Sequence, residues 1–166
     1  KLVDWNDRRT CVLFGDGAGA VVVRAEDDGK FFSAVGSDGS RGEILTCVSR
    51  SGGNFITKKQ PKMGFIAMDG QEVFKFAVKK VPSCIEEMLK EHQEKPEDIR
   101  YYLLHQANER IIAAVAKRLG EPAEKFPMNI SAYGNTSAAS IPILLDELNR
   151  EGKLNRGDKI VMAGFG

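Results

Sequence analysis

The sequence predicts an α/β fold, in which short buried strands alternate with helices of ten or more residues. The run Tyr101–Leu104 is aromatic and aliphatic, as expected of a buried strand. It is followed by apolar residues at helical spacing, Ile111, Val115 and Leu119. Near the end of the chain, another helical pattern leads into a second apolar strand at Lys159–Ala163. Alternation of this kind indicates helices layered on a sheet.

The N-terminal part of the chain contains shorter extended segments. Strands are predicted at Cys11–Phe14 and Ala18–Arg24, around a glycine turn in the motif FGDGAGA. A phosphate loop would need a glycine pattern that opens a helix, or a following G-K-[ST], and neither is present. A tight turn between strands is therefore the better interpretation. Further extended segments are predicted near Phe31–Val35 and Gly64–Met68, on either side of a stretch rich in glycine, serine and charge.

Three helical patterns follow. The first carries an apolar stripe of Phe74, Ala77, Val81, Ile85, Met88 and Leu89. Pro82 should kink or split this helix. Pro96 opens a predicted helical turn before the Tyr101 strand, and Gly120 is expected to cap the helix after that strand. An extended segment and a turn at residues 133–135 are predicted before the last helix, which ends near Arg150 and is capped by Gly152. Either Ser140 caps it, with a proline in the first turn, or it begins near residue 137 and is bent.

Composition narrows the class of protein. The chain has 166 residues, of which 42% are hydrophobic and 28% charged, with a net charge of +1. This is enough for one core, and it gives no basic surface for nucleic acid and no apolar run that could cross a membrane. Three cysteines without C-x-x-C spacing predict free thiols in a reducing, cytoplasmic compartment rather than disulfides or a zinc site. The absence of an initiator Met, and an end inside a predicted strand and turn, lead us to expect a fragment.

Two polar residues stand out as candidates for chemistry. His105 follows the carboxyl end of a buried strand, where open α/β sheets bind their ligands, although a lone histidine there can also be a satisfied core residue. Asn135 lies in YGNTSAAS, at a turn before a helix that begins with small residues, where an asparagine often serves only as a turn or cap. A histidine and an asparagine at two such positions could both donate hydrogen bonds to one carbonyl oxygen. Such an oxyanion hole stabilises an enolate or a tetrahedral intermediate.

Several motifs together resemble one family. HQANERI, thirty residues before the asparagine of GNTSAAS, resembles the C-terminal half of the β-ketoacyl-acyl-carrier-protein synthase III enzymes. DWNDRRTCVLFGDGAGAVVV, MDGQEVFKFAV and the closing AGFG resemble the same family in the same order. The resemblance implies a thiolase-like layered fold (αβαβα in a complete enzyme), with a mixed five-stranded sheet in each half. Residues 1–25 would be the last strands of the N-terminal half, and residues 26–166 the C-terminal half, truncated at its final glycine loop.

The resemblance also implies a reaction. Members of this family of acyltransferases condense acetyl-CoA with malonyl-acyl carrier protein at the start of fatty-acid synthesis. A Cys–His–Asn triad is used, and His105 and Asn135 match its second and third members. Gln106, Ala107, Asn108, Glu109 and Arg110 match the segment that meets the carrier protein or CoA, with Arg110 a natural partner for an acidic carrier or a phosphate. Glu109 departs from the family, which often has a non-acidic residue there.

The nucleophile is the main departure from the family pattern. None of Cys11, Cys47 and Cys84 matches the motif of the catalytic cysteine, so we expect this chain alone to be inactive. The expected partners are acyl carrier protein, a CoA thioester, the missing N-terminal half and a second copy in a homodimer. No metal or cofactor is expected beyond the substrates. Chalcone-synthase-like enzymes and long-chain starter ketosynthases use the same triad, and a non-catalytic half-domain that docks a partner is a third interpretation.

Overall fold

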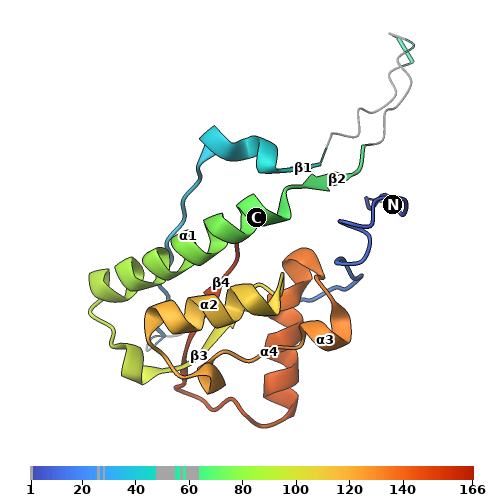
Figure 1. Cartoon of the computed structure of the whole chain (residues 1–166). Helices are drawn as coiled ribbons and strands as arrows, with labels where there is room; N and C mark the ends of the chain where they lie inside the picture. The colour runs from blue at the N-terminus through green and yellow to red at the C-terminus, as the bar shows by residue number, and fades with distance from the viewer. Residues whose placement is uncertain (1, 26, 28, 48–54, 57, 59–63) are drawn as a thin grey trace.

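Residues 2–25, 27, 29–47, 55–56, 58 and 64–166 are described by the structure, a computed structural model of the chain. Figure 1 shows the elements in chain order. The α-helices and strands are β1 (Leu45–Cys47), β2 (Ile66–Met68), α1 (Gly70–Glu91), β3 (Ile99–Leu104), α2 (Glu109–Leu119), α3 (Ile130–Tyr133), α4 (Ser140–Arg150) and β4 (Lys159–Ala163). The 3₁₀ turns are η1 (Gly39–Ile44), η2 (Pro96–Asp98), η3 (Ala123–Lys125) and η4 (Ser137–Ala139).

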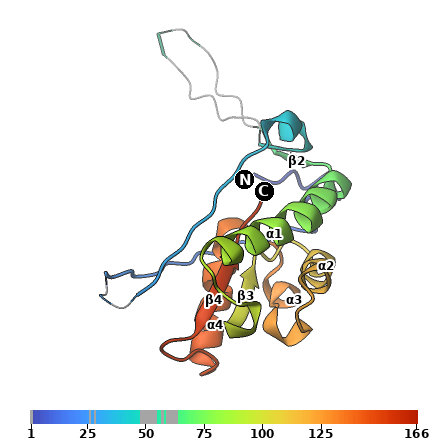
Figure 2. The same cartoon turned by 90° about the vertical axis from the view of Figure 1, so that its left-hand side faces the viewer.

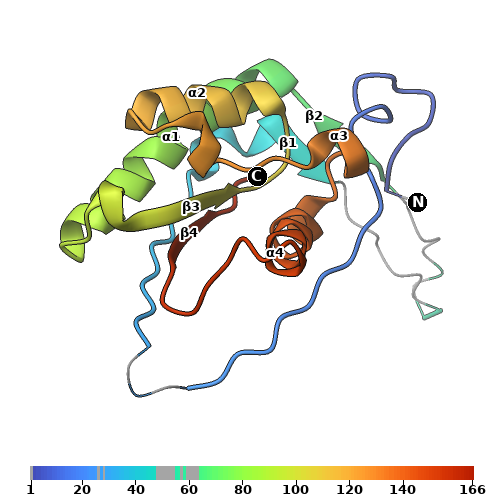
Figure 3. The same ribbon diagram turned by 90° about the horizontal axis from the view of Figure 1, so that it is seen from below.

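The centre of the fold is a parallel pair of strands, β3 and β4, in which Tyr102 lies opposite Val161. Helices α1 and α2 cover one face of this pair, and α4 covers the other (Figures 2 and 3). On the α4 face, Leu103 packs against Leu144 and Leu148. The larger core, on the opposite face, consists of Ala77, Val81, Ile85, Leu89, Ile99, Tyr102, Leu104, Ile111, Ile112, Val115, Ala116, Phe126 and Val161. A Val, Leu, Ile or Phe side chain stabilises the fold by about 1.5–3 kcal/mol when it is fully buried.

The α/β class and the two central strands are therefore as predicted, but the five-stranded sheet is not found. In the part of the chain that the structure describes, the central sheet has two strands, and β1 and β2 form a separate antiparallel pair. β2 lies within the segment predicted as extended at residues 64–68. Residues 31–35, also predicted as extended, pair with no strand among the described residues.

Helix α1 is continuous through Pro82, so the predicted split is wrong. Proline lacks the N–H that would bond to the carbonyl of Val78, four residues earlier. The Arg118 guanidinium of the neighbouring helix α2 instead approaches that carbonyl oxygen, at 3.5 Å. Pro82 is itself buried among the residues that α1 turns toward the core. The burial of Pro82 and the hydrogen bond from Arg118 to the carbonyl of Val78 thus help to stabilise the continuous helix.

The N-terminal strands were predicted wrongly. Residues 8–13 form turns, and Phe14 makes a single bridge to Asn135. Residues 16–23 then form no strand in the structure, and Val22 and Val23 are 99% and 87% exposed. A strand is stable only when its backbone N–H and C=O groups pair with a neighbour. High β-propensity alone therefore does not make a strand here.

The glycines of FGDGAGA allow close packing and do not form a turn. A Cβ atom at Gly15 would lie 2.0 Å from the carbonyl oxygen of Tyr133, and one at Gly19 would lie 2.3 Å from the Cβ of Pro142. Alternate residues of an extended chain point to the same side. Gly15, Gly17 and Gly19 therefore present an edge without side chains to the segment between Tyr133 and the first turn of α4. Figure 3 shows this part of the chain passing α4.

The region around Asn135 is more helical than predicted. The short helix α3 replaces part of the extended segment expected before Tyr133. Helix α4 begins at Ser140 with Pro142 in its first turn, which agrees with one of the two predicted arrangements. Ser140 is not the cap of that helix, however, because no side chain caps it. The predicted caps at Gly120 and Gly152 lie in the left-handed region, with φ of 71° and 66°.

Candidate active site

His105 lies directly after β3, at the carboxyl end of the central sheet. Its backbone N–H donates to the carbonyl of Ala163 at 2.9 Å, which extends the pairing of β3 with β4 by one residue. The imidazole Nδ1 lies 2.7 Å from Oγ of Ser140. The ring of Phe165 meets the imidazole edge to face, with 5.3 Å between centroids. Ser140 and Phe165, from two separate parts of the chain, therefore contact the ring, and the bond to Ala163 holds the backbone of His105.

The environment of His105 favours the neutral imidazole. Partial burial lowers its pKa from the usual 6.5, and no carboxylate contributes to the shift. In a neutral imidazole one nitrogen donates and the other accepts. Nδ1 is engaged by Ser140, whereas Nε2 makes no hydrogen bond within the described residues. Nε2 is thus the nitrogen that remains free for a ligand.

Asn135 is held through its backbone by the start of the chain. Its N–H donates to the carbonyl of Leu13, and its carbonyl accepts from the N–H of Gly15, both at 2.9 Å. Its side-chain Oδ1 accepts from the N–H of Ser137 at 2.9 Å. Only the oxygen of an amide can accept from an N–H, so the other atom must be the NH₂ group. This Nδ2 group makes no hydrogen bond within the described residues, although the residue is only 8% exposed.

The turn-forming and ligand-binding interpretations of Asn135 are therefore compatible. Its oxygen shapes the turn by holding Ser137, which has φ of 54° in the left-handed region. Its NH₂ group is left over as a donor. The same short segment, through η4, ends at Ser140, which contacts His105. The two candidate residues are thus connected through residues 135–140, and each keeps one side-chain nitrogen that makes no hydrogen bond within the described residues.

The five residues after His105 differ in accessibility. Gln106 is completely buried: its Nε2 donates to the carbonyl of Leu104 at 2.8 Å, and its Oε1 accepts from the N–H of Asn129 at 3.1 Å. Asn108 caps α2 by accepting from the backbone N–H of Arg110 at 2.8 Å. Ala107 and Asn108 are partly exposed, and residues 109 and 110 are exposed in the first turn of α2. Gln106 thus supports the site from within and Ala107 packs against the core, whereas residues 109 and 110 face outward.

No cysteine completes this pair in the present chain. Cys11 lies in a turn and is half-buried, while Cys47 in β1 and Cys84 in α1 are exposed. All three are free thiols, and none is hydrogen-bonded to His105. Cys11 was expected inside a strand, which is wrong for the reason given above. The imidazole of His105 is therefore not hydrogen-bonded to a cysteine nucleophile of this chain.

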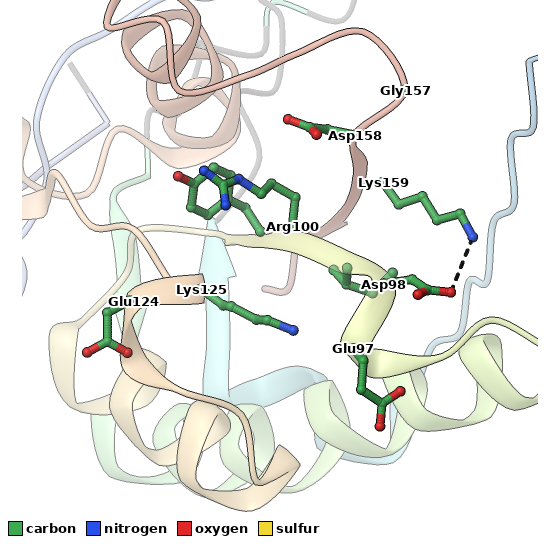
Figure 4. A pocket seen from close by; sticks show the side chains of 10 residues that line it. Glu97, Asp98, Arg100, Glu124, Lys125, Gly157, Asp158 and Lys159 are labelled. Carbon is green, nitrogen blue, oxygen red and sulfur yellow. Dashed lines mark ion pairs between the residues drawn. The ribbon is translucent and has the colours of Figure 1, made fainter.

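A hollow of the described surface lies away from these residues. It measures about 680 Å³ and opens at the amino ends of β3 and β4, whereas His105 follows the carboxyl end of β3 (Figure 4). Both of its lysines have partners: Lys159 pairs with Glu94 and Asp98, and Lys125 with Glu121. A smaller hollow is lined by residues 17–19 and 136–139, next to Asn135.

Sequence reasoning did not identify Ser140 or Gln106 as supports of the site. Ser140 was considered only as a helix cap, and Gln106 only as a carrier contact. The hydrogen bonds that reveal the role of Ser140 join residues 34 and 35 positions apart, and the bond from Asn129 to the Gln106 side chain spans 23 positions. No periodicity or local motif encodes a contact at that separation. The only signal was the run of small residues after Asn135.

Comparisons with known proteins agree along the chain. The family profile described as 3-oxoacyl-[acyl-carrier-protein (ACP)] synthase III C terminal matches residues 89–166, and the one described as 3-oxoacyl-[acyl-carrier-protein (ACP)] synthase III matches residues 1–39. A β-ketoacyl-[acyl-carrier-protein] synthase III from Synechococcus sp. (strain WH7803) is 47% identical over 100% of this chain and 51% of that protein. Its counterpart from Clostridium acetobutylicum is 48% identical over 100% of this chain and 52% of that protein.

A solved structure gives the same likeness. The crystal structure of 3-oxoacyl-[acyl-carrier-protein] synthase III from Aquifex aeolicus VF5 superposes with a TM-score of 0.86 at 46% identity, covering 99% of this chain and 50% of that chain. The chain thus spans about half the length of the curated relatives it matches. Within the described residues, no helix has the length and apolar character needed to cross a bilayer.

Proposed function

The chain belongs to the 3-oxoacyl-[acyl-carrier-protein] synthase III family, with its thiolase-like α/β fold, and we propose that it supplies the C-terminal part of such a condensing enzyme. In this proposal residues 1–25 are the last strands of the N-terminal half, and residues 26–166 form the C-terminal half. The exposed valines at residues 21–23 support this division, since they have the composition of a strand that would pair in the complete protein. The complete protein would transfer an acetyl group from acetyl-CoA to malonyl-acyl carrier protein, with loss of carbon dioxide.

Two side-chain nitrogens, Nε2 of His105 and Nδ2 of Asn135, make no hydrogen bond within the described residues, and the proposed reaction depends on both of them donating an N–H. When a malonyl thioester loses carbon dioxide, negative charge builds up on the thioester oxygen as an enolate forms. Donors that are already in place stabilise such charge without reorganisation, and removing one typically costs about 10²–10³ in rate. Nε2 of His105 and Nδ2 of Asn135 are available for this role because the opposite polar atom of each side chain is engaged by the protein.

The acyl-accepting nucleophile would come from outside this chain. The proposed enzyme first forms a thioester with a cysteine of the N-terminal half, which the enolate then attacks to give 3-oxoacyl-carrier protein. The three cysteines described here lie in a turn, a strand and the middle of a helix, without a hydrogen bond to the imidazole. We therefore expect the isolated chain to carry out neither acyl transfer nor condensation.

The carrier protein would dock beside the site, on the first turn of α2. Arg110 is exposed there and can pair with an acidic carrier or with the phosphate of its prosthetic arm. Glu109 is exposed next to it and would oppose an acidic partner, so the contact through that position is weakened. Gln106 is left out of this surface because its amide is buried and fully used.

The remaining features of the proposal follow from the family. The enzyme would act in the cytoplasm as a homodimer and would use its two thioester substrates without a further cofactor. The three free cysteines are those expected of a reducing compartment. The oligomeric state is checked by light scattering of the full-length protein.

The test of the proposed function is a condensation assay of the full-length protein. Acetyl-CoA and malonyl-acyl carrier protein should yield carbon dioxide and 3-oxobutanoyl-carrier protein, and the isolated chain should yield neither. Replacing acetyl-CoA with a series of longer acyl-CoA starters measures starter preference and would reveal a long-chain starter ketosynthase. Binding of carrier protein without release of carbon dioxide under any starter would refute the enzymatic proposal and favour a docking half-domain.

A further inference from the structure

Ser140 contacts His105 in a way that specifies the position of the imidazole proton. The serine is the first residue of α4, is only 2% exposed, and does not cap the helix it begins. Its Oγ lies 2.7 Å from Nδ1 of His105 and also accepts from the backbone N–H of Gln106, at 3.2 Å. One hydroxyl thus contacts both the imidazole and the backbone of the next residue.

We propose that Ser140 is a positioning residue that holds His105 in the tautomer with its proton on Nε2. The inference rests on the proposed function, because it assigns Nε2–H as the donor to the enolate oxygen. It adds a specific residue and a specific proton position to that function.

The donor and acceptor count of the serine hydroxyl supports this assignment. A hydroxyl donates one hydrogen and has two acceptor sites. The N–H of Gln106 occupies one acceptor site, so the hydroxyl hydrogen is free to be donated to Nδ1. The serine hydroxyl and Nδ1 are then both satisfied: Gln106 donates to Ser140, Ser140 donates to Nδ1, and the proton lies on Nε2, which makes no hydrogen bond within the described residues. This order also agrees with the neutral state of the partly buried ring.

The other tautomer leaves an unsatisfied donor. With the proton on Nδ1, the imidazole would donate to the serine oxygen, which would then accept twice. The serine O–H would need an acceptor, and it makes no other hydrogen bond within the described residues. Because the side chain is almost fully buried, water does not readily supply that acceptor, and a buried unsatisfied donor is disfavoured.

The position of Ser140 also explains why both His105 and Asn135 depend on one segment, residues 135–140. The backbone of Gln106 is fixed by the buried side chain of the same residue, so the hydroxyl has a rigid partner. Asn135, at the other end of residues 135–140, holds its own oxygen toward Ser137. Ser140 thus satisfies Nδ1 of His105, and Ser137 satisfies Oδ1 of Asn135. In the proposed tautomer, each of the two residues then keeps one N–H donor for a ligand.

The tautomer is measured directly by ¹⁵N NMR of the full-length protein labelled on histidine. Couplings to ring protons distinguish a protonated from an unprotonated nitrogen, and the His105→Gln variant identifies the signals of His105. We expect Nδ1 without a proton and Nε2 with one at neutral pH. In Ser140→Ala we expect both nitrogens to shift toward an average, as the two tautomers become mixed.

The same variants are assayed for malonyl decarboxylation. Because Ser140→Ala redistributes a donor without deleting it, the rate constant should fall about tenfold, less than the roughly 10²–10³ for loss of a donor. KM should change less than kcat. Ser140→Thr retains a hydroxyl on the same carbon and should restore the Nε2–H signal and much of the rate. Ser83→Ala is a matched control, since it removes a hydroxyl that bonds only to the carbonyl of Lys79 in α1.

Two results overturn the inference. One is a proton on Nδ1 of His105 in the unmodified protein, which needs no variant to fold. The other is an unchanged tautomer and rate in Ser140→Ala. Failure of the proposed function is a different outcome: the unmodified protein would show the Nε2–H tautomer but would not decarboxylate malonyl-carrier protein.

Discussion

Filling the glycine edge of the N-terminal segment should loosen the support of Asn135. In Gly19→Ala the new Cβ would lie 2.3 Å from Cβ of Pro142, where an ordinary contact is no closer than about 3.4 Å. The proline ring lies in the first turn of α4 and cannot rotate away. In Gly15→Ala the clash is with the backbone oxygen of Tyr133, at 2.0 Å. One of the two chain segments must therefore move in either variant.

The magnitude follows from these contacts. Overpacking of this kind costs about 1–3 kcal/mol. Replacing glycine by alanine also removes freedom from the unfolded chain, which stabilises by about 0.4–1 kcal/mol at a compatible position. The free energy of unfolding should thus fall by roughly 1–2 kcal/mol in Gly15→Ala and Gly19→Ala. Gly17→Ala should cost less, because its nearest contact is the end of the flexible Ile143 side chain, at 2.8 Å.

The assay combines urea unfolding of the full-length protein with amide hydrogen exchange. The N–H of Asn135 donates to the carbonyl of Leu13, so its protection reports whether the N-terminal segment stays in place. Gly42→Ala is the matched control, since a Cβ there meets nothing within 4 Å. If Gly19→Ala matches this control both in stability and in exchange at Asn135, residues 15–19 do not pack against α4, and the reasoning fails.

Three further outcomes are expected. In the full-length enzyme, His105→Ala and Asn135→Ala should each lower malonyl decarboxylation by about 10²–10³ while single-turnover acetylation of the cysteine falls less; normal decarboxylation with failed acetylation would contradict this division of roles. Gln106→Leu should lower the free energy of unfolding by about 2–4 kcal/mol in urea titrations, because it leaves the buried carbonyl of Leu104 and N–H of Asn129 each without a partner at about 1–3 kcal/mol. Since burial lowers the pKa of His105, the unfolded chain binds a proton below about pH 6.5 that the folded chain does not, so stability should fall as pH drops through that window, and His105→Gln should remove this part of the slope in urea titrations at several pH values.

The sequence predicts well the elements that repeat a buried face along their own length. The stripe of α1 and the periodic residues of α2 meet each other directly, and the apolar runs of β3 and β4 pair in the centre of the fold. Periodicity predicts these elements because each repeats its buried face at the spacing of its own backbone. The segment at Val22 shows the limit: its strand-like composition has no effect on structure unless another strand lies beside it.

The residues of the candidate site also fall into two groups, those that the sequence can single out and those that it cannot. His105 and Asn135 could be selected from sequence because each is a polar residue at a junction between elements, where ligands commonly bind. The residues that hold them could not, because their roles depend on contacts between distant parts of the chain. The sequence predicts that Ser140 caps a helix, whereas in the structure its hydroxyl contacts the imidazole of His105, 35 residues earlier in the chain.

These distant contacts determine how His105 and Asn135 can respond to change. The backbone of Asn135 is bonded to Leu13 and Gly15, near the start of the chain, whereas His105 is bonded to Ala163 and packs on Phe165, near its end. A change near the start of the chain should therefore affect Asn135 first, and a change near its end should affect His105 first. Within the part of the chain that the structure describes, residues 135–140 connect the two directly, and this segment has little side-chain bulk and one residue in the left-handed region. The backbone geometry of this segment should therefore influence how Nε2 of His105 and Nδ2 of Asn135 lie relative to each other.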